Sequence, residues 1–209
     1  MSLPNSTKYQ VTRSLLTALL IGLLSCGQAQ EKEVTGAPTN EIVDAARSQV
    51  GKTTTYDGSY VKLGYPGGDI ALERGVCTDV IIRALRTANS MDLQKLVHED
   101  MVANFSKYPK IWGLQRTDRN IDHRRVPNLK TYFKRRGYAV PVTKKKADYL
   151  PGDLVTCTVP PNLPHIMVVS NRKNARGVPL VIHNIGRGAQ EEDTLFTYPL
   201  TGHYRLKAD

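Results

Sequence analysis

The order of the hydrophobic patterns along the chain limits the possible folds more than any other feature. Apolar residues recur with the spacing of amphipathic helices in the first part, whereas the second part holds short β-branched runs bounded by turns. This order predicts an α+β fold in which N-terminal helices pack on an antiparallel sheet. The expected helices span residues 41–50, 77–88, 92–105 and 129–136, and the expected strands span residues 153–159, 165–170, 179–185 and 204–206.

The N-terminal segment has the layout of an export signal. Lys8 and Arg13 are the only charged residues before Glu31, and an apolar run covers residues 15–24. About 20 residues are needed to span a bilayer core, so this run is too short to be a transmembrane helix. A basic segment followed by a short apolar one is typical of a signal peptide.

The end of the apolar run resembles the lipobox of bacterial lipoproteins. The sequence Leu-Leu-Ser-Cys-Gly ends the run, and the resemblance implies that residues 1–25 are removed and that Cys26 is lipidated. Gly27 is not the aspartate associated with inner-membrane retention, which favours a periplasmic lipoprotein anchored in the outer membrane. The alternative is a plain signal peptide cleaved near residues 28–30, which would give a soluble periplasmic or secreted protein.

The exported part divides into a tether and one domain. Residues 26–40 are polar and include Gly36 and Pro38, as expected of a tether, and residues 41–209 form the predicted domain. A domain of this length can bury a core without a metal or a disulfide, and we expect no cofactor and no metal.

The charge of the chain indicates its partner class. The chain carries 29 Lys and Arg against 19 Asp and Glu, a net charge of +10, which favours anionic partners. Export argues against nucleic acid. We therefore expect binding to peptidoglycan or another anionic envelope polymer, and contact with the membrane through the lipid anchor.

Cys77 is the candidate nucleophile. It follows Gly75 and Val76 at the predicted start of an apolar helix. The helix dipole and free N–H groups at such a position lower the pKa of a thiol, and the same N–H groups can stabilise an oxyanion. The alternatives are a buried structural cysteine or a disulfide with Cys157, which we otherwise expect to pack in a strand.

Two histidines could assist this cysteine. His165 opens one predicted strand and His183 lies near the end of the next. If the strands pair, the imidazoles can approach on one face, where one acts as a base and the other fixes its tautomer. A register shift of one residue would replace His183 with Asn184, so both stay candidates for the third position.

Five short motifs occur in chain order at residues 65–68, 75–79, 151–155, 165–169 and 181–183. They are similar to those of the NlpC-type papain-like cysteine peptidases of the bacterial cell wall. The resemblance implies a papain-like fold, with Cys77 as nucleophile, His165 as base, His183 as the orienting residue and Tyr65 in the substrate cleft. Val76 and Thr78-Asp79 replace an acidic residue and Ser-Gly of the family pattern, which changes the expected cleft floor.

Longer stretches carry a closer resemblance, and they span residues 60–69, 75–80, 92–101, 120–129, 183–188 and 202–205. These stretches resemble the bacterial family named domain of unknown function 1287. The resemblance extends from about residue 40 to residue 206, nearly the whole predicted domain, and the family name assigns no substrate.

Three further residues are candidates for binding substrate. Arg124 belongs to the densest polar stretch, residues 118–125, which is either a substrate loop whose arginines bind carboxylates or a salt-bridged structural loop. Asp79 lies beside the nucleophile, and Asn184 is expected at the cleft mouth.

The predicted function is that of an envelope cysteine hydrolase, an amidase or peptidase that cleaves peptidoglycan stem peptides through an acyl-enzyme. The alternatives are a non-catalytic wall-binding lipoprotein that keeps the cleft, and an acyltransferase that uses the same triad.

Overall fold

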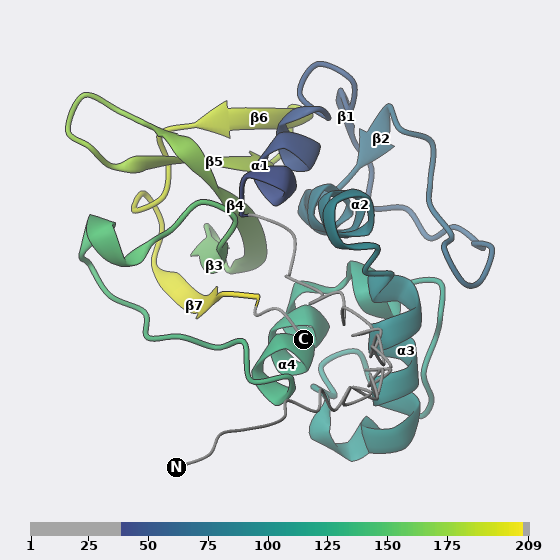
Figure 1. Ribbon diagram of the computed structural model, residues 1–209. Coiled ribbons are helices and arrows are strands. Elements are labelled where there is room, and N and C mark those ends of the chain that lie inside the picture. The colour runs from purple at the N-terminus through teal and green to yellow at the C-terminus, as the bar shows by residue number, and fades with distance from the viewer. Residues whose placement is uncertain (1–38, 207–209) are drawn as a thin grey trace, which may run out of the picture. The chain divides into compact units, whose positions relative to one another are not determined.

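The computed structural model describes residues 39–206, in which helices precede a sheet (Figure 1). The signal peptide 1–25, the lipidation site Cys26 and most of the tether lie outside the described residues. None of the described helices has the length and hydropathy required to cross a bilayer. The α-helices are α1 (Thr39–Arg47), α2 (Cys77–Asn89), α3 (Leu93–Asn104) and α4 (Val126–Arg135), with 3-10 turns η1 (Phe105–Lys107), η2 (Asp122–Arg124) and η3 (Lys146–Asp148).

The main sheet has five antiparallel strands in the order β6-β5-β4-β3-β7. Its central strand carries Val168, which pairs with Leu154 on one side and Ile182 on the other. Two very short strands, β1 and β2, pair in parallel outside this sheet. The strands are β1 (Thr55–Tyr56), β2 (Arg74–Gly75), β3 (Leu154–Val159), β4 (Leu163–Lys173), β5 (Pro179–Asn184), β6 (Ala189–Glu192) and β7 (Leu200–Tyr204).

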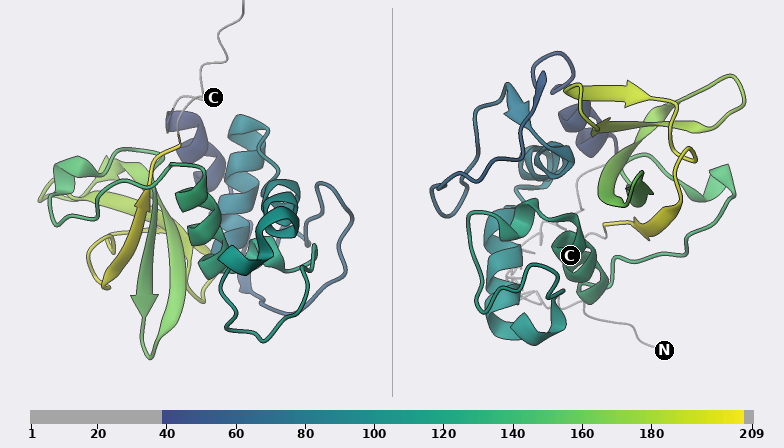
Figure 2. Two further views of the ribbon diagram at one scale, coloured as in Figure 1. Left: turned by 90° about the horizontal axis from the view of Figure 1, so that it is seen from below. Right: turned by 180° about the vertical axis from the view of Figure 1, so that it is seen from behind.

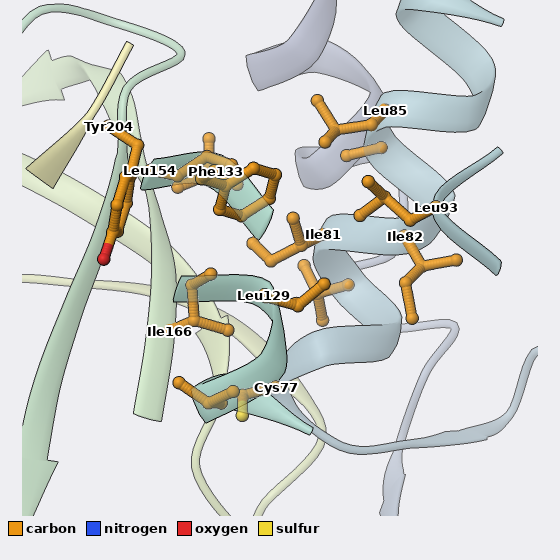
Figure 3. Packing of buried hydrophobic residues seen from close by; sticks show 14 of the residues in the cluster. Cys77, Ile81, Ile82, Leu85, Leu93, Leu129, Phe133, Leu154, Ile166 and Tyr204 are labelled. Atoms are coloured by element: carbon orange, nitrogen blue, oxygen red, sulfur yellow. The ribbon is translucent and has the colours of Figure 1, made fainter. Parts of the chain in front are cut away.

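Helices α1, α2 and α4 pack against one face of the sheet, and α3 packs on α2 and α4 (Figure 2). The main hydrophobic core lies between these two layers. It joins Ile81 and Leu85 of α2 to Phe133 of α4 and Ile166 of β4, with Cys77 at one end (Figure 3). The predicted α+β class, with N-terminal helices on an antiparallel sheet, is confirmed.

Helix α2 forms where its apolar period predicts. Val80, Ile81, Ala84 and Leu85 are fully buried against the sheet layer, and truncating a leucine at such a site costs about 2–5 kcal/mol. The carboxylate of Asp79 accepts a hydrogen bond from the Val76 N–H at 2.7 Å, which satisfies a free donor at the start of the helix.

The opposite face of the sheet carries a second apolar cluster. Cys157 is 1% exposed in this cluster with Val155 and Met167, whereas Cys77 belongs to the main core. Both thiols are free. The alternative of a Cys77–Cys157 disulfide is therefore wrong, and the expected packing role of Cys157 is confirmed.

Several element boundaries differ from the sequence prediction. Helix α1 begins at Thr39, within the expected tether, and ends at Arg47, so that Val50 is exposed rather than packed. Helix α4 begins at Val126, three residues early, because Pro127 fits the first turn of a helix. Strand β7 ends at Tyr204, where a strand was expected to begin. Strand β6 and the two-residue strands β1 and β2 were not predicted.

Candidate active site

Cys77 is the first residue of α2 and lines a pocket of about 440 Å³. Its side chain is 4% exposed. The walls of the pocket come from the loop after β1 and from the segment that precedes α4. Other residues that line it are Tyr56, Tyr60, Trp112, Arg124, Arg125 and Pro164.

Burial controls the protonation of the cysteine. Removal from water raises the pKa of the Cys77 thiol to about 12, and the negative charge of Asp79 also raises it. Backbone N–H groups of Ile166 and Thr78 donate to the sulfur and lower the pKa, but they do not offset the burial. The expected lowering by N–H groups at the helix start is therefore present but outweighed by burial, and the net shift of the pKa is upward.

The two candidate histidines contact each other directly. Nε2 of His165 lies 2.7 Å from Nδ1 of His183, and the side chains are 3% and 0% exposed. Nε2 of His183 lies 3.0 Å from Oε2 of Glu192, which in turn accepts a hydrogen bond from Arg187 through its other oxygen. A chain that runs from the buried His165 and His183 to the half-buried Glu192 therefore ends at the exposed Arg187.

This chain fixes the tautomer of His165. An ionised carboxylate only accepts hydrogen bonds, so His183 donates its Nε2–H to Glu192. Nδ1 of neutral His183 is then an acceptor, and it takes the Nε2–H of His165. Nδ1 of His165 is consequently left without a proton, as a base requires.

Burial keeps both imidazoles neutral. Desolvation, with a smaller effect from His183, lowers the pKa of His165 to about 3. Desolvation also lowers the pKa of His183, and the neighbouring Glu192 opposes this effect.

The sulfur lies beside the backbone of the strand that carries His165. Pairing of β4 with β5 extends only to Val168 and Ile182, so it ends before Ile166 and Asn184 would meet. At this end the Ile166 N–H donates to the Cys77 sulfur. Side chains alternate along a strand, so His165 faces the side of the sheet opposite to Ile166. The thiol and the imidazole of His165 are therefore directed to opposite faces of the sheet, and no hydrogen bond joins them within residues 39–206.

Asn184 holds the loop that precedes the cysteine. Its Nδ2 donates to the carbonyl of Gly75 at 2.9 Å, and its side chain is buried. Strand alternation places it on the face opposite to His183. Of the two candidates for the third position, His183 is the one that contacts His165.

Asp79 and Arg124 form a buried ion pair. The guanidinium binds both carboxylate oxygens at 2.9 and 3.0 Å, and it also donates to the carbonyls of Asp57 and Ser59. The backbone carbonyl of Arg124 accepts from the Thr78 hydroxyl at 3.1 Å. Nε, Nη1 and Nη2 of Arg124 each donate within the protein, which ties the pocket wall to the first turn of α2.

Tyr65 lies away from the Cys77 pocket. Its ring packs edge-on against His98 at 5.4 Å, and Arg119 lies over it at 5.5 Å. The tyrosines that line the pocket are Tyr56 and Tyr60. Burial raises the pKa of Tyr56 to about 12, with a further contribution from Cys77. The place beside the nucleophile expected for Tyr65 is therefore taken by Tyr56.

Sequence reasoning missed Glu192 and Tyr56. Glu192 lies in an acidic pair on the unpredicted strand β6, and Tyr56 lies in a Gly-rich and Tyr-rich loop with several equivalent tyrosines. Neither residue has a local signal that marks it out. Within residues 39–206, no cluster of three or more His, Cys, Asp or Glu side chains is arranged to hold a metal ion.

Comparison with known proteins identifies the family of the chain. The uncharacterized protein YijF of Escherichia coli (strain K12) is 57% identical over 164 residues, which cover 78% of this chain and 80% of YijF. The structure of NlpC1 from Trichomonas vaginalis aligns with a TM-score of 0.40 and 14% identity over 84% of this chain and 48% of that chain, so this chain spans about half its length. The family described as "Domain of unknown function (DUF1287)" matches residues 43–206. The chain therefore belongs to the DUF1287 family.

Proposed function

We propose that the protein is a cysteine peptidase or amidase that cleaves peptidoglycan stem peptides through an acyl-enzyme on Cys77. The observation that carries this proposal is the chain from His165 through His183 to Glu192, which leaves Nδ1 of His165 free of a proton. The thiol lies beside Ile166, the residue next to this base. A nucleophile, a base and a residue that orients the base are the parts that acyl transfer requires.

The proposed reaction begins with proton transfer. Nδ1 of His165 takes the thiol proton while the sulfur attacks the amide carbonyl carbon. Backbone N–H groups of the first turn of α2 stabilise the oxyanion. The imidazolium then protonates the leaving amine as the C–N bond breaks. Water, deprotonated by His165, attacks the thioester, and the carboxylic acid product leaves with the thiol restored.

The buried charges determine how the proton moves. Because the pKa of Cys77 is raised and that of His165 is lowered, the resting pair is a neutral thiol and a neutral imidazole. The proton is therefore transferred as the sulfur attacks, rather than from a standing thiolate–imidazolium pair. Glu192 stabilises the positive charge that the histidines gain in this step.

The substrate and the location are part of the same proposal. The net charge of +10 suits an anionic wall polymer, and the N-terminal features support a periplasmic lipoprotein anchored in the outer membrane. The motifs shared with cell-wall peptidases support the stem peptide as the substrate.

Mass spectrometry of peptidoglycan fragments tests the proposal. Fragments incubated with the full chain should show cleavage of an amide bond, and Cys77→Ala should abolish it. Cys157→Ala is the matched control, because that thiol packs in the second cluster and should be dispensable. Equal cleavage by the wild type and Cys77→Ala would refute the assignment.

A second candidate is a non-catalytic protein that binds the wall. The 4% exposure of Cys77 and its raised pKa favour it, because a buried neutral thiol is a poor nucleophile. Binding of wall fragments without cleavage, equal for the wild type and Cys77→Ala, would identify this function.

A further inference from the structure

Two neighbouring arginines in the Cys77 pocket differ in the hydrogen bonds that their guanidinium groups donate. Arg124 binds Asp79 and two backbone carbonyls. The side chain of Arg125 makes no hydrogen bond within residues 39–206, and its Nη1 is buried without a partner. Buried polar groups are normally hydrogen-bonded, so the unpaired Nη1 of a residue that lines the pocket requires an explanation.

The position of Arg125 is nevertheless fixed. Its guanidinium stacks over the ring of Trp112 at 4.2 Å from the centroid. The nearest acid is Asp122, whose Oδ1 lies 3.7 Å from Nη1, beyond hydrogen-bond distance. Stacking holds the plane of a guanidinium and leaves the N–H groups at its edge able to donate.

The other residues that line the pocket include no side chain that would repel an anion. The lining includes Tyr56, Tyr60, Val76 and Pro164, and it contains no acidic side chain. Arg125 therefore supplies the cation with free donors in the pocket that Cys77 also lines. A planar fork of N–H groups matches a carboxylate in two parallel hydrogen bonds.

We propose that Arg125 binds a carboxylate of the substrate in the Cys77 pocket, so that the protein acts on acidic peptides. This inference rests on the proposed attack by Cys77 and adds the substrate class. Arg125 replaces Arg124 as the arginine that meets a substrate carboxylate.

The test compares two alkylating reagents on the full chain. Iodoacetate and iodoacetamide both transfer their carbon to a thiol and release iodide, but only iodoacetate carries a carboxylate. The rate of Cys77 alkylation by each reagent is measured at one pH by mass spectrometry of the peptide that contains Cys77. The ratio of the iodoacetate rate to the iodoacetamide rate is then divided by the same ratio for the free thiol N-acetylcysteinamide, which corrects for the intrinsic reactivity of the reagents. Arg125→Gln removes the cation, Arg125→Lys keeps it, and Arg119→Gln removes a charge from the same loop outside the pocket.

The normalised preference for iodoacetate should be about tenfold in the wild type, as one charge-assisted hydrogen bond provides. It should fall to about one in Arg125→Gln and persist in Arg125→Lys and Arg119→Gln. A wild-type value near one would overturn the proposal without any variant and would show that Arg125 only pairs with Asp122. An unchanged preference in Arg125→Gln would also overturn it.

Wall fragments separate this inference from the proposed function. Fragments whose carboxylates are converted to methylamides should be cleaved about tenfold more slowly than native fragments by the wild type. Arg125→Gln should cleave both at similar rates. If native fragments are not cleaved but iodoacetate is preferred, the proposed function fails and the carboxylate site stands. If they are cleaved with no preference in either assay, the carboxylate site alone fails.

Discussion

Nε2 of His165 and Nδ1 of His183 lie 2.7 Å apart and share one hydrogen bond. Because Glu192 requires the Nε2–H of His183, the shared proton belongs to His165. The orienting residue is thus itself a histidine held by a carboxylate. His183 and Glu192 therefore act on His165 as one unit. The losses of activity caused by replacing each of them should not be additive.

Replacing His183 should separate its orienting role from its packing. His183→Ala removes the acceptor of the His165 Nε2–H and should lower kcat/KM on wall fragments by roughly 10²–10⁴-fold, the contribution of general base catalysis. His183→Gln supplies a carbonyl oxygen that can accept the same proton. We expect it to keep more activity than the alanine variant at equal folding, measured by circular dichroism. Equal loss in both would argue against the tautomer-fixing role.

Glu192→Gln should change the pH profile. The charge of Glu192 raises the pKa of His183 against the lowering by burial, so its removal should lower this pKa further. The acid limb of kcat/KM should move to lower pH, and the maximum should fall because the imidazolium is less stabilised.

Glu191→Gln is the matched control for this variant. Glu191 is the preceding residue on β6, but it pairs with Arg47 and Ser170 instead of the histidines. Its replacement should affect stability and leave the acid limb in place. An upward shift of the acid limb in Glu192→Gln would contradict the account.

Lowering the pH should begin to destabilise the fold at pH values well above those at which most carboxylates titrate. Burial lowers the pKa of His165 to about 3 and that of His123 to about 4, against about 6.5 in the unfolded chain. Between these values the unfolded state binds more protons, so the free energy of unfolding falls as pH falls below about 6.5. Each histidine should account for roughly 2 kcal/mol by pH 5.

Urea unfolding between pH 7 and pH 5 measures this effect. His123→Gln should make the dependence shallower, because it removes one of these histidines without touching the proposed active site. A stability that stays constant or rises toward pH 5 would contradict the neutral, buried state of these imidazoles.

Breaking the pair of Asp79 and Arg124 should be costly. Arg124→Met leaves a buried carboxylate and two backbone carbonyls without their donor, and should lower the free energy of unfolding by about 3–5 kcal/mol. The double variant Asp79→Ala/Arg124→Met should lose less than the sum of the single changes. Chemical denaturation of all three measures the coupling, and strict additivity would show that the pair contributes little.

Local patterns predicted the helices well because their signals lie within each segment. At the start of α3 the side chain of Asp92 accepts from the Gln94 N–H, which is the local capping that this residue type favours. The apolar period from Cys77 to Ala88 gave α2 to within one residue. Strand β6 has no such signal, because Ala189–Glu192 is polar and lies at the edge of the sheet. Its pairing with β5 arises from tertiary contacts.

The candidate site was predictable only in part, because contacts between distant segments leave no local signal in the sequence. Cys77, His165 and His183 were found because each stands at the start or near the end of a predicted element. The partners that fix their states come from distant or featureless segments. Glu192 reaches His183 across a hairpin, and Tyr56 lies beside Cys77 through the pairing of β1 with β2.

The most direct test of the central claim is to trap the acyl-enzyme. Full chain mixed with wall fragments and quenched with acid should carry an added mass, equal to the acyl part of the cleaved fragment, on the peptide that contains Cys77. The adduct should be absent in Cys77→Ala and form far more slowly in His165→Ala. Cleavage that proceeds undiminished in Cys77→Ala, without any adduct in the wild type, would contradict the account.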